Sequence, residues 1–174
     1  LGMALGLPGI PFMYFTLPLA MSNDFDYYLQ TGNPRELNRG RVVLEDVVRD
    51  LADQETLSQK VFSAYKQLLR LRASHPAFHP DGALIPVSTG NPAIISFLRK
   101  SVDGSEQVLV IQNVSASKQE VKVVFPQDHI SDKNIAESEA TIWVDLISQE
   151  SLPARGNILD LVLQPFAIKW LKRS

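Results

Sequence analysis

The sequence has no cysteine among its 174 residues. This absence excludes a disulfide framework, a thiol nucleophile and a zinc site built on thiolates. It also suits a reducing compartment, so we expect a cytoplasmic protein. An excess of charge of one sign is lacking too, because 17 Lys and Arg face 19 Asp and Glu and the basic residues are dispersed. Neither nucleic acid nor an anionic membrane surface is therefore an expected partner.

The first 20 residues lack any charge and resemble a membrane or secretory segment in composition. However, Pro8, Pro11 and Pro18 interrupt any helix that would span a membrane, and a signal peptide carries positive residues at its start. We therefore interpret this stretch as part of a buried barrel or sheet. Since the chain opens at Leu1 in apolar sequence, without a methionine before it, we expect it to be cut out of a longer protein.

Complete catalytic motifs are lacking as well, since nothing in the sequence matches HExxH, a P-loop or GxSxG. Asp24 and Asp26 are candidates for a carboxylate pair, but alternating aspartates in a loop are more typical of solvated or helix-capping groups. Of the three histidines, His75 and His79 bracket a proline-rich helix end and are expected to be capping or surface groups, and the third is His129. We assign no catalytic residue, no metal ligand and no cofactor.

The first half of the chain shows helical and buried-strand patterns. Apolar side chains recur at three- and four-residue spacing over residues 56–74, which predicts a helix with one buried face. A continuous apolar run at residues 10–15 is typical of a strand buried on both faces of a parallel sheet. The other expected elements are the end of a helix at 1–7, a long polar loop at 16–40 and a short helix at 42–51.

After Gly82 the pattern changes to short β-type runs separated by turn signals such as "TGNP", "VDGS" and "PARGN". Several runs alternate between apolar and polar residues, which predicts an all-β antiparallel sandwich. The expected strands are residues 83–87, 93–99, 107–113, 120–125, 141–147, 158–163 and 167–172. A domain boundary near residue 80 divides this α+β chain into residues 1–80 and residues 81–174.

The stretch "TGNPRELNRGR", residues 31–41, has three arginines and no hydrophobic rhythm. In the simplest interpretation its asparagine closes a turn and its arginines pair with the acids Glu36, Glu45 or Asp46. In the functional interpretation a guanidinium, which is a rigid fork of donors, holds vicinal hydroxyl groups or an anion. The candidates are Arg35, Asn38 and Arg39, because their loop follows a predicted buried strand and α/β barrels build active sites after such strands.

Several motifs resemble one family. "GLPGIPFMYF" resembles the eighth-strand segment of α-amylase superfamily barrels, and "LLRLRASHPAF" resembles the last barrel helix and its exit. "SND" followed by "TGNPRELNR" resembles the sucrose phosphorylase branch, which has an Asn-Asp pair before a Gly-(X)-Arg-(Asp/Glu)-(Ile/Leu)-Asn-Arg signature. "LQPFAIKWL" resembles the superfamily's C-terminal domain. The resemblance covers essentially the whole chain and is most specific at Asn23-Asp24 and residues 35–39.

The resemblance implies that residues 1–80 are the last β/α segment of a TIM (β/α)8 barrel and that residues 81–174 are its C-terminal domain. It also implies a glycosyltransferase-type phosphorylase, in which an aspartate nucleophile and a glutamate acid/base upstream of Leu1 transfer glucose from an α-glucoside such as sucrose to phosphate. Arg35 matches the arginine that binds the glucosyl unit in the donor subsite, and Asn38 and Arg39 match residues that shape the same loop. Pro34 departs from the family pattern.

Two other functions stay open at this point. One is plain hydrolysis by an α-amylase-like or sucrose-hydrolysing parent, because only "TGNPRELNR" favours phosphorolysis. The other is a non-catalytic sandwich that binds glycans through Trp143 and Trp170, although their alternating strands favour burial of both. The chain alone is expected to be inactive and to need the missing barrel portion or to self-associate. The acceptor, whether fructose, a phosphorylated fructose or glycerate, is not determined by these residues.

Overall fold

The computed structural model describes residues 1–39, 41–125 and 140–174. Contacts divide the chain into two compact units, Pro11–Leu69 and a larger unit made of Leu1–Ile10 with Arg70–Ser174. This division differs from a boundary near residue 80, because the first ten residues associate with the β domain. Across the described ranges, no helix has the length and apolarity needed to cross a membrane.

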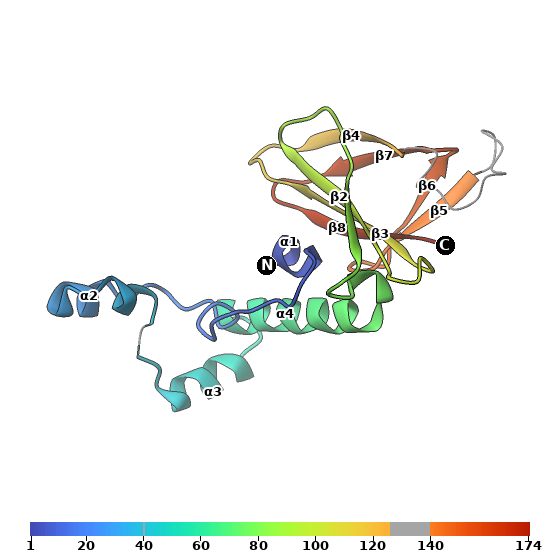
Figure 1. Ribbon diagram of the computed structural model, residues 1–174. Coiled ribbons are helices and arrows are strands. Elements are labelled where there is room, and N and C mark those ends of the chain that lie inside the picture. Colours follow the sequence, from blue (N-terminus) through green and yellow to red (C-terminus); the bar gives the residue numbers. More distant parts are fainter. Residues whose placement is uncertain (40, 126–139) are drawn as a thin grey trace. The chain divides into compact units, whose positions relative to one another are not determined.

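The larger unit contains one curled sheet of eight strands in which every pairing is antiparallel (Figure 1). The strand order is β1-β2-β3-β8-β5-β6-β7-β4. The strands are β1 (Ala83–Pro86), β2 (Ile94–Lys100), β3 (Gln107–Asn113), β4 (Gln119–Val124), β5 (Ala140–Asp145), β6 (Ser151–Arg155), β7 (Ile158–Leu163) and β8 (Ile168–Arg173). The prediction of an all-β antiparallel sandwich is confirmed.

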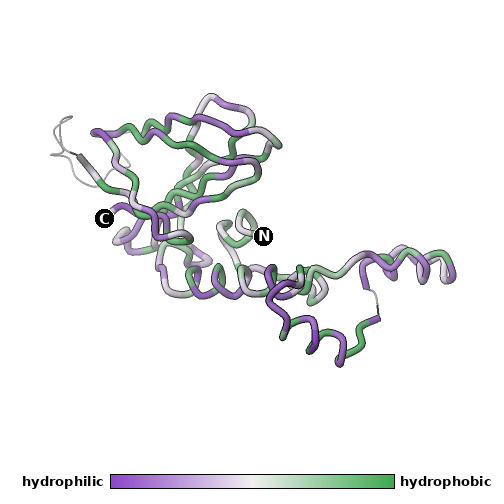
Figure 2. Tube along the Cα trace, turned by 180° about the vertical axis from the view of Figure 1, so that it is seen from behind, coloured by the Kyte–Doolittle hydropathy of each residue, from purple (hydrophilic) through white to green (hydrophobic). Residues whose placement is uncertain are grey.

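The inner face of the curled sheet surrounds the main core. Along β4 and β7, buried apolar residues alternate with exposed ones. Figure 2 shows hydrophobic and hydrophilic residues following one another along this part of the chain. Phe125 and Trp143 stack in this core with ring centroids 4.7 Å apart and planes 5° apart. The other core residues include Leu98, Leu109, Ile111, Val123, Leu159, Leu163 and Leu171.

A second apolar layer lies on the opposite face of β2, β3 and β8. Phe97, Val110 and Trp170 are in register across these strands and alternate with residues of the main core. The short helix α1 (Gly2–Gly6) packs on this face, and a Cβ added at Gly6 would lie 3.1 Å from a Val110 methyl group. Glycine therefore permits this close approach of helix and sheet. Phe78 contacts Trp170 from the 3-10 helix η2 (Pro76–Phe78), with ring centroids 4.5 Å apart.

Two arginines hold the N-terminal segment in this unit through its backbone carbonyl groups. Arg72 donates to the carbonyl oxygens of Leu7 and Gly9, at 3.0 and 2.6 Å. Arg99 is fully buried and donates to the carbonyl oxygen of Gly6 at 2.8 Å. Burial lowers the pKa of Arg72 and lowers the pKa of Arg99 to about 10. No described acid pairs with either guanidinium, so the carbonyl dipoles stabilise both charges.

Glu106 forms a second buried polar cluster in the same unit. Its Oε1 lies 2.9 Å from Nδ1 of His75 and 2.7 Å from Nζ of Lys172, and its Oε2 accepts the Ala77 N–H at 3.1 Å. Burial alone would raise the pKa of Glu106, but these hydrogen bonds outweigh it and lower the pKa below its ordinary value. His75 was expected to be a capping or surface group. It occupies the N-cap position of η2, but its side chain contacts the buried Glu106 carboxylate instead of capping the helix. His129 lies outside the described residues.

The smaller unit contains α2 (Phe25–Thr31), the 3-10 helix η1 (Pro34–Asn38), α3 (Leu44–Ala52) and most of α4 (Leu57–Ser74). Asp24 caps α2 by accepting the Tyr27 N–H at 2.9 Å, and Gly32 ends it with a φ of 65°. Thr56 caps α4 by accepting the Gln59 N–H at 3.2 Å. The helices predicted at 42–51 and 56–74 are confirmed with slightly shifted ends, as is the capping role of Asp24.

Two expectations for residues 10–40 are wrong. Residues 10–15 form no strand, and the side chains of Ile10 and Phe12 are 85% and 92% exposed. A parallel strand is held by neighbouring strands on both sides, and none of the described strands pairs with this segment. The segment expected to be a loop at 16–40 contains α2 and η1. Asp24 caps the start of α2, and Asn33 caps the start of η1.

Candidate functional site

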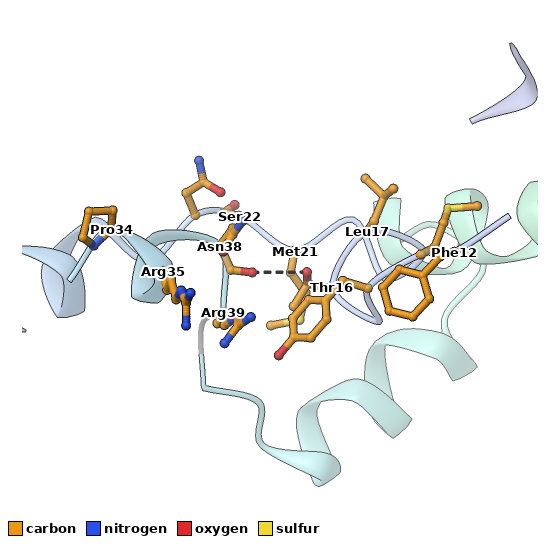
Figure 3. Close-up of a pocket in the computed structure, with 12 residues that line it drawn as sticks. Phe12, Thr16, Leu17, Met21, Ser22, Pro34, Arg35, Asn38 and Arg39 are labelled. Carbon is orange, nitrogen blue, oxygen red and sulfur yellow. Dashed lines mark hydrogen bonds between the residues drawn. The ribbon is translucent and has the colours of Figure 1, made fainter. Parts of the chain in front are cut away.

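A cavity of about 620 Å³ lies within the smaller unit, between residues 12–23 and residues 34–39 (Figure 3). It contains the sequence-predicted Arg35, Asn38 and Arg39 together. The remaining lining residues are Phe12, Met13, Tyr14, Thr16, Leu17, Met21, Ser22, Asn23 and Pro34. The structure therefore brings the three candidates to one concave surface.

Arg35 is positioned by the start of η1. Asn33 caps this turn, because its Oδ1 accepts the Arg35 N–H at 3.1 Å. Pro34 occupies the first helical position, where a missing N–H and a fixed φ are favourable. The residue that departs from the family pattern thus begins the 3-10 turn that presents Arg35.

Hydrogen bonds join η1 to the other wall of the cavity. The Asp24 N–H donates to the carbonyl oxygen of Leu37 at 2.8 Å. Thr16 Oγ1 donates to the carbonyl oxygen of Asn38 at 3.4 Å, the bond drawn in Figure 3. Asn38 therefore contributes its backbone to the cohesion of the loop.

The arginines of the cavity do not form the ion pairs that the simplest interpretation expected. Neither Arg35 nor Arg39 has a side-chain hydrogen bond or salt bridge with any described residue, and both side chains are exposed. Glu36 accepts a hydrogen bond from Asn33 at 3.3 Å instead. Asp46 pairs with Arg49 of its own helix at 2.7 Å. The donors of both cavity arginines are thus free to meet a ligand.

Tyr14 is a cavity residue that sequence reasoning missed. The Arg39 guanidinium carbon lies 5.7 Å from the centroid of the Tyr14 ring, which is within cation–π range. Tyr14 and Phe12 were expected inside a buried strand, and their apolar pattern gave no sign of a cavity role. Arg41, the third arginine of the loop, instead lies 4.6 Å from the Tyr27 ring centroid and outside this lining.

The side chains of the cavity are suited to binding. Its described lining contains two arginines, several hydroxyl and amide groups and no carboxylate or histidine. Asp24 is engaged in capping α2, and the part of the chain that the structure describes holds no cluster of three metal-ligating side chains. The cavity can therefore hold hydroxyl groups or an anion, and its described lining contributes no carboxylate or imidazole for acid/base catalysis.

Comparison with known proteins shows similarity at the level of one domain and of nearly the whole chain. Residues 86–170, from the end of β1 into β8, match the family described as Maltogenic Amylase, C-terminal domain. The chain is 31% identical to a glucosylglycerate phosphorylase of Escherichia coli (strain K12), over 97% of this chain and 26% of that protein. A glucosylglycerate phosphorylase of Spirochaeta thermophila is 35% identical over 70% of this chain and 20% of its own length.

Two solved enzyme structures share the fold. An α-amylase of Geobacillus thermoleovorans, complexed with acarbose, matches with a TM-score of 0.70 and 15% identity, over 99% of this chain and 32% of that one. A trehalulose synthase of Pseudomonas mesoacidophila matches with a TM-score of 0.64 and 21% identity, over 99% of this chain and 37% of that one. The chain spans about a fifth to a quarter of the length of the two phosphorylases compared above.

Proposed function

We propose that this chain is part of a retaining glycoside phosphorylase, in which residues 1–80 complete a (β/α)8 barrel and residues 81–174 form the C-terminal β domain. The enzyme cleaves an α-glucoside and transfers the glucosyl unit to phosphate, which releases α-glucose 1-phosphate. Similarity to glucosylglycerate phosphorylases over nearly the whole chain supports this class of reaction. The two carboxylates of a retaining mechanism lie, in this proposal, outside the chain.

Arg35 is the proposed donor-sugar ligand, and one observation supports it above others. Its guanidinium faces a cavity of suitable size without being consumed by an ion pair to a described residue. A rigid fork of donors can hold two neighbouring sugar hydroxyls and so restrain the glucosyl unit while the glycosidic bond breaks. Asn38 and Arg39 are proposed to support the same loop, and the carbonyl oxygen of Asn38 accepts a hydrogen bond from Thr16.

The substrate of the parent is proposed to be a small α-glucoside. Sucrose was expected from the loop signature, whereas three relatives carry the name glucosylglycerate phosphorylase and one the name glucosylglycerol phosphorylase. We therefore place a glucoside of a three-carbon acceptor before sucrose. Hydrolysis is the second candidate, supported by the match to a Maltogenic Amylase domain. A glycan-binding role for the β domain is disfavoured, since Trp143 and Trp170 are 5% and 0% exposed.

The apolar segment after Gly9 is proposed to need further protein around it. Ile10, Phe12 and Phe15 are exposed to solvent, and apolar side chains on such a segment favour association. In the parent this cover comes from the rest of the barrel. In the isolated chain we expect self-association, which sedimentation analysis would detect. A monodisperse monomer would contradict it.

Mutation of Arg35 in the full-length parent tests the proposed function. Arg35→Ala is expected to lower kcat/KM for phosphorolysis by more than about tenfold with folding intact, because a hydroxyl clamp acts largely in the transition state. Arg41→Ala is the matched control, since it removes the same charge from the same loop outside the cavity. Unchanged kinetics for Arg35→Ala would remove this residue from the site.

The products distinguish the candidate reactions. Phosphorolysis by the parent yields α-glucose 1-phosphate in a phosphate-dependent manner, whereas hydrolysis yields free glucose. The purified 174-residue chain should yield neither, because the cavity has no described carboxylate. Formation of α-glucose 1-phosphate by this chain alone would refute the proposed division of the active site.

A further inference from the structure

The cavity carries an unbalanced positive charge. Its described lining residues include Arg35 and Arg39 and no acid, so the lining contributes two positive charges and no negative one. The acids closest in sequence are occupied elsewhere, because Asp24 caps α2 and Glu36 accepts from Asn33. A neutral sugar does not require this arrangement, since uncharged amides can also bind hydroxyl groups.

Both arginines belong to the same turn. Arg35 lies in η1 and Arg39 follows its last residue, and Figure 3 shows both side chains on the same side of this turn. Both line the cavity, and neither forms an ion pair with a described acid. Two positive groups on one concave surface attract an anion.

Arg39 differs from Arg35 in its contact with an aromatic ring. Its guanidinium carbon lies 5.7 Å from the Tyr14 ring centroid, which is within cation–π range. This contact uses no N–H donor, so the donors are available for a bidentate bond to a carboxylate or phosphate. The Thr16 hydroxyl donates to the carbonyl oxygen of Asn38, the residue immediately before Arg39.

We propose that Arg39 binds an oxyanion, either inorganic phosphate or the carboxylate of the glucoside's acceptor, beside the sugar that Arg35 binds. This assignment rests on the proposed function, and it gives Arg39 a ligand-binding role instead of loop support alone. An acceptor such as glycerate carries the required carboxylate, whereas glycerol and fructose do not. Arg39 therefore determines specificity for charge.

Binding measurements on the full-length parent test this proposal independently of turnover. Inorganic phosphate, D-glycerate and glycerol are titrated by calorimetry at constant ionic strength against the wild type, Arg39→Gln, Arg39→Lys and Arg41→Gln. Arg39→Gln should weaken at least one of the two anions by about tenfold or more, as expected for loss of a charge-assisted bidentate bond. Glycerol binding should be unchanged, and Arg39→Lys should recover only part of the affinity.

The outcomes distinguish phosphate from the acceptor carboxylate as the ligand. They also separate the anion-binding proposal from the proposed phosphorylase reaction. A loss confined to phosphate identifies phosphate as the ligand, a loss confined to glycerate identifies the acceptor carboxylate, and a loss of both indicates a shared subsite. Equal effects of Arg39→Gln and Arg41→Gln, or no effect of either, would overturn the assignment. If the parent releases no α-glucose 1-phosphate but Arg39 still governs anion affinity, the proposed reaction fails and the oxyanion subsite stands.

Discussion

Replacing Arg99 by methionine should destabilise the β domain strongly, because this buried guanidinium connects segments far apart in the sequence. It donates to the carbonyl oxygens of Gly6 and His79 at 2.8 and 2.7 Å, and more weakly to those of Gly82 and Ala83. Methionine keeps the apolar stem but removes every donor, so these carbonyl groups lose a partner inside the protein.

The magnitude follows from two opposing contributions. Each short bond from a charged donor contributes roughly 1.5–3 kcal/mol. Against this, burial lowers the pKa of Arg99 well below its ordinary value, to about 10, which corresponds to a penalty of roughly 3 kcal/mol for the charged form at neutral pH. The penalty disappears with the charge, but the carbonyl oxygen of the buried Gly6 then loses this hydrogen-bond donor. We therefore expect Arg99→Met to lose about 2–4 kcal/mol of unfolding free energy.

Urea unfolding followed by tryptophan fluorescence measures this loss, since Trp143 and Trp170 are both buried in the β domain. Arg70→Met is the matched control, because Arg70 is an exposed residue of α4 and should change stability by less than about 0.5 kcal/mol. Hydrogen exchange of residues 1–10 should accelerate in Arg99→Met. If Arg99→Met loses no more unfolding free energy than the control, the proposed stabilising role of Arg99 is refuted.

Glu106→Gln should lower stability at pH 7 by about 1–2 kcal/mol, because it removes the charge that pairs with Lys172. The pKa of Glu106 is lowered in the fold, so its contribution is present above the unfolded-state pKa of about 4.3 and is lost as pH falls through the folded value. Thermal melts from pH 7 to pH 3 should therefore show the two proteins converging in acid, and a constant gap would contradict this. Phe125→Ala should cost about 3–5 kcal/mol by opening a cavity beside the stacked Trp143 ring, whereas Val124→Ala, at a position that is 48% exposed, should cost much less in the same unfolding assay.

The strands could be predicted from the sequence because their signals are local. Seven expected strands have ends within two residues of the observed ones, since alternation and turn residues mark each strand independently of its partners. β6 was missed because Pro153 was assigned to a turn. The strand accommodates this proline at a position where it pairs mainly with β5, as β6 meets β7 only through Arg155 and Ile158.

Pairing and burial of distant segments could not be predicted in the same way. The face of β2, β3 and β8 that α1 covers depends on the register of Phe97, Val110 and Trp170, which no local pattern specifies. Residues 10–15 were predicted to be buried, but the structure exposes most of them. Their composition fits a buried strand, but burial requires neighbouring strands, and the described chain provides none for them.

The arginines show that the sequence alone does not distinguish a ligand-binding arginine from one that stabilises the fold. Arg99 and Arg35 are equally polar in the sequence, yet one is surrounded by carbonyl groups and the other by an open cavity. The difference comes from what surrounds each guanidinium in the fold, because a buried cation must have its donors satisfied while an exposed one is solvated until a ligand arrives. The free donors of Arg35 and Arg39 are therefore informative only together with the cavity that they line. The motif alone pointed to the loop that lines this cavity, and the lack of a carboxylate among the described lining residues favours anion binding as the interpretation of Arg39.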